Sequence, residues 1–164
     1  EPEQKTAALI DQQVYMIAQS EKLGFLQQFL REGEYDKVIV FANRRDQVRD
    51  LYLKLKQEGF AVAMLSGEMS QDKRESHLDR FKQGEARIMI ATDVAGRGIH
   101  VDDISHVINY TLPDQVDDYV HRIGRTGRAG ASGVSIALAD EDDSFLLPAL
   151  QKHFGADTLT MIQP

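Results

Sequence analysis

Two kinds of segment alternate along the chain. Short runs of apolar, often β-branched residues are typical of strands, whereas longer runs with an apolar residue every three or four positions are typical of amphipathic helices. Residues 37–41 (KVIVF) are apolar almost without a break, which predicts a strand buried on both faces of a sheet. Residues 46–58 follow as a predicted helix, with Val48, Leu51 and Leu55 on one face.

The same alternation continues on both sides of this unit. Further strands are predicted at residues 14–18, 61–65, 87–91, 106–110 and 133–139. Further helices are predicted from about residue 21 with Ser20 as the N-cap, after an N-cap at Ser70, and over residues 114–123 and 144–153. Strands that alternate with helices indicate right-handed crossovers and a mostly parallel sheet with helices on both faces. We therefore predict a single three-layer α/β domain over residues 1–164.

The carboxyl ends of the strands are where an open parallel sheet binds its ligands. Polar residues and loops that directly follow the predicted strands are therefore candidates for a site. They are Asn43, Ser66, Gly67, Thr92, Asp93 and the loop after Ile123.

Composition narrows the class of protein but not its partner. The chain has no cysteine, which excludes disulfides and thiolate metal sites and favours a reducing, cytoplasmic setting. No apolar run approaches the roughly 20 residues of a membrane helix, so we expect no membrane partner. The net charge of −7 argues against a general nucleic-acid binder, yet residues 121–128 contain three arginines and no acid.

Those residues, 121–128 (HRIGRTGR), place an arginine at every third position. The planar guanidinium group matches phosphate oxygens two bonds at a time, and a cluster of them suits the charge on a transferred γ-phosphoryl group. We expect the side chains of Arg122 and Arg125 to project together from one edge of the sheet into an open groove. The alternative is a solvated basic turn that pairs with Asp117 and Asp118.

Three more segments carry polar residues beside predicted strand ends. Residues 91–100 (ATDVAGRGIH) combine a hydroxyl, a carboxylate and an arginine in a loop whose glycines expose backbone N–H groups. Residues 65–74 (LSGEMSQDKR) place a glutamine and an arginine one turn apart near a helix N-terminus, where anions bind readily. Residues 41–45 (FANRR) end a strand with two arginines. Taken singly, each of the three could be a helix cap or a solvated turn.

Together and in this order, the four motif segments (residues 41–45, 65–74, 91–100 and 121–128) resemble those of the DEAD-box family of superfamily 2 helicases. The resemblance runs from about residue 14 to residue 154, and the wording of the last two segments is similar to the bacterial RhlB-type subfamily. It implies that the α/β domain is RecA-like. It also implies that residues 1–13 are a linker from an N-terminal RecA-like domain.

The resemblance implies a role for each matching residue in the second motor domain of an ATP-dependent RNA helicase. Arg122 and Arg125 would contact the γ-phosphate of ATP. Other nucleotide and interdomain contacts would come from Asp93, His100, His121 and Arg128. The RNA backbone would lie on Asn43, Gly67, Gln71, Arg74, Thr92, Arg97 and Gly98. The sequence departs from the family at His100, where many members have an aspartate that contacts ribose, and at Gly96, which replaces a common alanine and should loosen the loop.

The sequence contains neither a G-x-x-x-x-G-K-[ST] phosphate loop nor a D-E-A-D segment. ATP and Mg²⁺ would therefore be bound mainly by the N-terminal RecA-like domain, and this chain alone should hold neither and be inactive. The alternatives are a protein-interaction module that recruits the helicase to an RNA-degradation assembly, and a superfamily 2 motor that acts on DNA. Expected partners are the N-terminal domain, RNA, and RNA-degradation or ribosome-assembly proteins.

Overall fold

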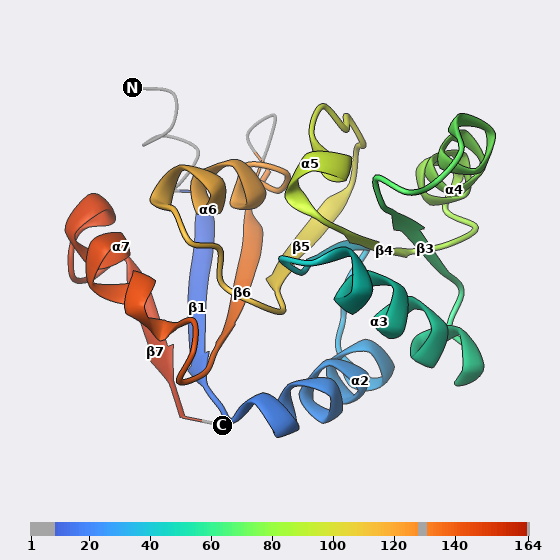
Figure 1. The fold of residues 1–164 in the computed structure, drawn as a ribbon. Coiled ribbons are helices and arrows are strands. Elements are labelled where there is room, and N and C mark those ends of the chain that lie inside the picture. The colour runs from blue at the N-terminus through green and yellow to red at the C-terminus, as the bar shows by residue number, and fades with distance from the viewer. Residues whose placement is uncertain (1–8, 128–130, 164) are drawn as a thin grey trace.

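Seven strands among the described residues form one parallel sheet (Figure 1). The computed structural model describes residues 9–127 and 131–163. The strands lie in the order β3-β4-β2-β5-β6-β1-β7, and every neighbouring pair is parallel. They are β1 (Ile10–Met16), β2 (Lys37–Phe41), β3 (Val62–Leu65), β4 (Ile88–Ala91), β5 (Ile104–Asn109), β6 (Gly133–Ala139) and β7 (Leu159–Ile162).

Helices cover both faces of this sheet (Figure 1). α2 and α3 pack on one face, and α4, α5, α6 and α7 pack on the other. Their bounds are α2 (Lys22–Glu32), α3 (Arg45–Gln57), α4 (Gln71–Gln83), α5 (Asp93–Gly96), α6 (Val116–Ile123) and α7 (Leu147–Phe154), with 3-10 helices η1 (Gln19–Glu21) and η2 (Ser144–Leu146). Within the described ranges, none of these helices is long and apolar enough to cross a membrane.

The central strand β2 explains why the sheet needs helices on both faces. Val38 and Val40 pack with α2 and α3, whereas Ile39 and Phe41 pack with α4 and α5. Alternate residues of a strand point to opposite faces, so a strand that is apolar at every position is stable only where both faces are covered. The predicted strand at residues 37–41 and the predicted α/β fold are confirmed.

Two strand predictions differ from the structure. The first strand begins at Ile10 rather than residue 14, so residues 10–13 belong to the sheet and not to a linker. Polar side chains at residues 11–13 hid this start, although Gln12 is buried. β7 was not predicted, because it lies at the sheet edge and only Leu159 of its four residues is buried.

Helix starts show where the sequence predicts caps well. Ser70 caps α4 as predicted, because its Oγ accepts a hydrogen bond from the backbone N–H of Lys73 at 3.3 Å. The prediction of Ser20 as the N-cap of the first helix was wrong, because Ser20 lies inside η1 and the N-cap of α2 is Glu21. The 3-10 turn shifts the start of the α-helix along the chain. Serine is a typical N-cap residue, but Ser20 no longer lies where the first free N–H groups of α2 are.

A buried cluster of charges fixes the start of α2. The Nζ of Lys22 lies 2.9 Å from a carboxylate oxygen of Asp140 and 2.9 Å from one of Asp143, and Lys22 is 1% exposed. Asp143 also accepts hydrogen bonds from the backbone N–H groups of Asp140 and Leu112. The acidic run at residues 140–143 is therefore partly a buried counter-charge for one lysine.

Replacing Lys22 with methionine should destabilise the domain by about 3–5 kcal/mol, because two buried carboxylates would lose their cation. Burial by itself would raise the pKa of Asp140, but hydrogen bonds from Lys22 and from the N–H groups of Asp142 and Asp143 hold that pKa below its ordinary value. A depressed carboxyl pKa stabilises the fold above the unfolded value of roughly 3.9 and ceases to do so as pH falls through the folded value.

Urea unfolding of both proteins at neutral and acidic pH measures this effect. The stability difference between the unaltered protein and Lys22→Met should shrink as the pH falls, since the carboxylates then lose the charge that needs a partner. A stability difference that is small at pH 7, or that grows on acidification, would contradict the role of Lys22 as the buried partner of Asp140 and Asp143.

Candidate functional site

The ends of three adjacent strands supply the centre of the site. β4, β2 and β5 are neighbours in the sheet, and the residues at or just after their ends lie together. Asn43 follows β2, Asp93 follows β4, and Asn109 ends β5. Because all three strands run in the same direction, their carboxyl ends meet at one edge, as predicted for ligand sites of such sheets.

The side chain of Arg122 from α6 joins these three strand ends. Its Nε and Nη2 donate to the two carboxylate oxygens of Asp93 at 2.6 and 2.7 Å. Its Nη1 donates to Asn109 Oδ1 at 2.9 Å and to the carbonyl of Thr111 at 2.7 Å, and its Nη2 also donates to Asn43 Oδ1 at 2.7 Å. A guanidinium group has five N–H donors, so every donor of Arg122 is engaged inside this domain.

The prediction that Arg122 projects into an open groove was therefore wrong. The residue is 1% exposed, and its guanidinium carbon lies 5.3 Å from the centre of the Phe41 ring. An ion pair and stacking of this kind hold a planar group in one orientation. Arg122 fixes the motif segments relative to one another. Asp93 pairs with Arg122 inside this domain, and not with a group of a neighbouring domain.

Arg125 occupies a different environment from Arg122. Its Nη1 donates to the carbonyl of Ile99 at 2.8 Å and its Nε donates to the carbonyl of His121 at 3.3 Å. The residue is half-buried and lines two hollows. One of them, of about 370 Å³, is also lined by Asp93, Arg97 and His121. Arg122 lines this hollow too, but only 1% of its surface is exposed, so the two predicted arginines differ in burial and in the engagement of their donors.

The remaining nucleotide-side predictions fall on two exposed histidines and one arginine. His100 is exposed in the loop after α5 and lines the second hollow beside Arg125. His121 is exposed on α6 and lines the first. Arg128 lies outside the described residues. The structure thus brings both histidines next to Arg125.

Several of the residues predicted to bind RNA make internal contacts. The Oγ1 of Thr92 caps α5 by accepting from the N–H of Ala95 at 3.4 Å. The Nη1 of Arg74 donates to the carbonyl of Ala95 at 2.7 Å, which ties α4 to α5. The Nδ2 of Asn43 donates to the carbonyl of Leu112 at 2.9 Å. These contacts hold the motif segments in one arrangement.

The other predicted RNA residues lie at the surface. Gln71 is exposed, and its Nε2 donates to Glu75 at 3.2 Å. Gly67 and Arg97 are exposed, and Gly98 has a φ of 81°, which favours glycine. These exposed residues offer backbone groups and the positive charge of Arg97 to solvent.

Sequence reasoning missed three residues that surround Arg122. They are Phe41, Asn109 and Thr111. Asn109 had a usable signal, because it is the polar end of the apolar strand β5 and is fully buried. Thr111 contacts Arg122 through its carbonyl group, which no side-chain pattern can reveal, and its Oγ1 accepts a hydrogen bond from the N–H of Asn43 at 2.9 Å.

Gly96 lies in contact with the same Phe41 ring. It is buried in α5, and a Cβ at this position would lie 3.2 Å from Phe41 Cε1 and 3.4 Å from Ala91 Cβ. Close packing against a ring that Arg122 also touches therefore leaves little room for a side chain at residue 96. The slight loosening of the loop that we expect from Gly96 stays a prediction.

The sequence from residue 21 to residue 130 matches the family of helicase conserved C-terminal domains. The chain belongs to this family. It is 51% identical over 146 residues to the ATP-dependent RNA helicase RhlB of Pseudomonas syringae pv. tomato, a match that covers 89% of this chain and 37% of that protein. RhlB of Pseudomonas putida is 52% identical over 155 residues, or 94% of this chain and 39% of that protein. The chain thus spans less than two fifths of the length of these relatives.

Solved structures show the same relationship for this helicase C-terminal domain. The E. coli DEAD-box protein SrmB, bound to the regulator of ribonuclease activity RraA, superposes with a TM-score of 0.84 at 36% identity, covering 94% of this chain and 89% of SrmB as solved. S. cerevisiae Dbp5 bound to RNA and ADP BeF3 gives a TM-score of 0.83 at 34% identity, covering 93% of this chain and 41% of that one. The predicted resemblance to DEAD-box proteins and the RecA-like fold are confirmed.

The acidic and histidine side chains that the structure describes do not gather into a metal site. Over residues 9–127 and 131–163, no group of three or more His, Cys, Asp and Glu side chains could hold a metal ion. The donors that the site does offer are arginine N–H groups and backbone N–H groups, which suit phosphate oxygens rather than cations.

Proposed function

We propose that this chain is the second motor domain of an ATP-dependent RNA helicase, with Arg125 directed toward the phosphates of ATP held on an N-terminal RecA-like domain. The observation that carries this proposal is the contrast between the two arginines. Both residues line the hollow of about 370 Å³, but Arg122 is 1% exposed and has all its donors engaged inside the domain, whereas Arg125 is half-buried and lines a second hollow as well. Arg122 is then a positioning residue and Arg125 the residue that reaches the nucleotide.

The geometry suits a part that moves as a rigid body. Arg122 ties the segments after β2, β4 and β5, and Arg74 ties α4 to α5. If RNA binds to Gly67, Arg97 and Gly98, its binding energy acts on the same rigid unit that carries Arg125. ATP and RNA would each favour the closed arrangement of two domains, and closure would strain the RNA backbone locally.

ATP and Mg²⁺ would be held by the N-terminal domain, with Mg²⁺ supplying charge neutralisation of the phosphates when bound. This chain would add positive charge beside the γ-phosphate, with Arg125 and His121 lining the hollow of about 370 Å³. Arg128, outside the described residues, is proposed as a further contact between the two domains. His100 is placed beside Arg125, where it would face the nucleotide in place of a carboxylate.

RNA-stimulated ATP hydrolysis tests the proposal. A protein that joins this chain to its N-terminal domain should hydrolyse ATP faster with single-stranded RNA than with DNA of the same sequence, whereas residues 1–164 alone should show no turnover. Turnover by the isolated chain would contradict the division of labour between the domains. A two-domain protein that RNA does not stimulate would contradict the proposal as a whole.

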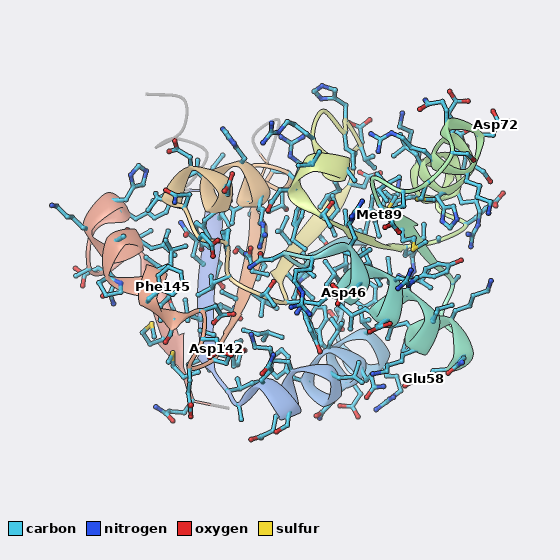
Figure 2. All side chains as sticks on the ribbon, in the orientation of Figure 1. Asp46, Glu58, Asp72, Met89, Asp142 and Phe145 are labelled. Atoms are coloured by element: carbon cyan, nitrogen blue, oxygen red, sulfur yellow. The ribbon has the colours of Figure 1, made fainter. Side chains whose placement is uncertain are left out.

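Recruitment of another protein is a second candidate function, which the solved relatives favour. SrmB is bound to RraA, and Dbp5 is bound to Gle1 in a further structure. The present chain also exposes Phe145 in η2, far from α3 and α4 (Figure 2), with 61% of its surface accessible. An RNA-degradation or ribosome-assembly protein is the kind of partner this candidate implies.

A further inference from the structure

A groove crosses the outer edge of the sheet between α3 and α4. β3 is the edge strand, with α3 on one face of the sheet and α4 on the other (Figure 1). The hollow between them has a volume of about 680 Å³. We call it the α3–α4 groove, and the residues that matter here are Arg45, Arg49, Tyr52, Met64, Lys73 and His77.

The α3–α4 groove is positive on a protein whose net charge is −7. Arg45, Arg49 and Lys73 line it together with one carboxylate, Glu68, which lies 3.5 Å from Arg45. Over the described ranges, neither Arg49 nor Lys73 forms an ion pair, and both are exposed. Two cations therefore remain available to an anion that enters the groove.

Acids near the ends of the two helices do not neutralise these cations. Asp46 pairs with Arg44 at 3.1 Å, outside the α3–α4 groove. Asp72 lies at the outer end of α4 and does not line the groove (Figure 2). The groove thus keeps an excess of positive charge.

Aromatic rings line the middle of the groove. The rings of Tyr52 and His77 meet at 61° with centroids 5.6 Å apart, and Lys56 lies 5.6 Å from the centre of the Tyr52 ring. The Nδ1 of His77 accepts a hydrogen bond from the backbone N–H of Met64 at 3.1 Å. Burial, and then the charges of Arg80, Lys56 and Lys73, lower the pKa of His77.

This hydrogen bond decides what kind of ligand the groove can take. A neutral His77 occupies the N–H group that the edge strand would otherwise offer to another strand, so strand addition is blocked at Met64. This favours a ligand that contacts the side chains of the groove, which are cations beside an aromatic ring. Single-stranded nucleic acid, with phosphates and flat bases, matches that combination.

We propose that the α3–α4 groove binds the sugar-phosphate backbone of single-stranded RNA beyond the residues that the resemblance assigns to RNA, with Arg49 and Lys73 contacting phosphates and Tyr52 facing a base. The proposal rests on the RNA helicase function proposed above. Continuity supports it, because Ser66 and Ser70 of the second motif segment line the same groove. Arg45 belongs both to this groove and to the hollow beside Asn43.

The test compares RNA binding by the two-domain protein and its Arg49→Gln/Lys73→Gln variant. Fluorescence anisotropy would be measured with oligouridylates of increasing length, in a non-hydrolysable ATP analogue, over a range of salt concentrations. The variant should bind the shortest oligonucleotides normally and long ones several-fold more weakly. With long RNA, the slope of log Kd against log salt should fall by about 1.4, since each phosphate contact of a single strand contributes about 0.7.

A matched control removes two lysines elsewhere. Lys54→Gln/Lys152→Gln changes the net charge equally, at exposed positions on α3 and α7 that do not line the groove, and should leave the length dependence unchanged. Urea unfolding of both variants would show that they fold like the unaltered protein.

Three outcomes would overturn the proposal. If the Arg49→Gln/Lys73→Gln variant bound RNA as tightly as the unaltered protein at every oligonucleotide length, RNA would be excluded from the groove, even if an acidic peptide bound there. An equal loss at every length would place both cations in the main RNA track. If the unaltered protein bound no RNA at all, the proposed helicase function would fail together with the groove.

Discussion

Substitution of Arg122 by alanine is expected to reduce the free energy of unfolding by on the order of 3–5 kcal/mol. The change would leave the buried amide oxygen of Asn109 and the partly buried oxygens of Asn43 and Thr111 without their shared donor, and Asp93 without its cation. The Asp93 side chain is 27% exposed, so water can compensate part of its loss and the lower end of the range is expected. Urea unfolding of residues 1–164, followed by circular dichroism, measures the effect.

Two further substitutions separate the charge of Arg122 from its shape. Arg122→Lys keeps the positive charge but cannot reach acceptors on three sides at once, so most of the loss should remain. Asp93→Asn keeps an acceptor oxygen and should cost less than Arg122→Ala. A loss below about 1 kcal/mol for Arg122→Ala would be typical of an exposed ion pair and would contradict its central position.

Substitution of Arg125 by alanine is expected to affect ATP hydrolysis strongly and stability less, in contrast to Arg122→Ala. In the two-domain protein, RNA-stimulated ATP hydrolysis should fall by about 10³-fold, because an arginine that contacts the transferred phosphoryl group typically contributes at least that much. Stability should fall less than after Arg122→Ala, since Arg125 is half-buried whereas Arg122 is 1% exposed. Steady-state turnover at saturating ATP and RNA, beside urea unfolding, measures both quantities.

The control for Arg125 is an arginine on the opposite face of the sheet. Arg31→Ala on α2 removes the same charge from an exposed ion pair with Glu58 and should leave turnover unchanged. Arg125→Lys should remain strongly impaired, because one ammonium group cannot match two phosphate oxygens. If Arg125→Ala lowered turnover by less than about tenfold, Arg125 would not contact the transferred phosphoryl group.

The opposite behaviour expected of Arg122 and Arg125 also shows the limit of motif spacing. Both residues belong to one short segment and have the same side chain, and sequence reasoning assigned them one role. α6 ends at Ile123, with Gly124 as its C-cap, so Arg122 lies on the helix and Arg125 in the turn that follows. The different backbone positions, and not the residue type, give the two guanidinium groups different hydrogen-bond partners.

The α3–α4 groove is a second case in which sequence distance hides a site. Arg49 and Lys73 lie on helices that pack on opposite faces of the sheet, and only the edge position of β3 brings them to one hollow. Each taken alone reads as a solvated helix residue. His77 likewise becomes informative only once its Nδ1 is seen to accept from Met64.

The amino-acid sequence by itself determined the class of fold and the place of the site. Continuous apolar runs such as residues 37–41 require a sheet covered on both faces, and parallel strands bring the residues after them to one edge. Only the tertiary structure decided which polar groups meet there. The acceptors of Arg122 come from the ends of three strands far apart in the chain, and a buried guanidinium group is stable only where all of them converge.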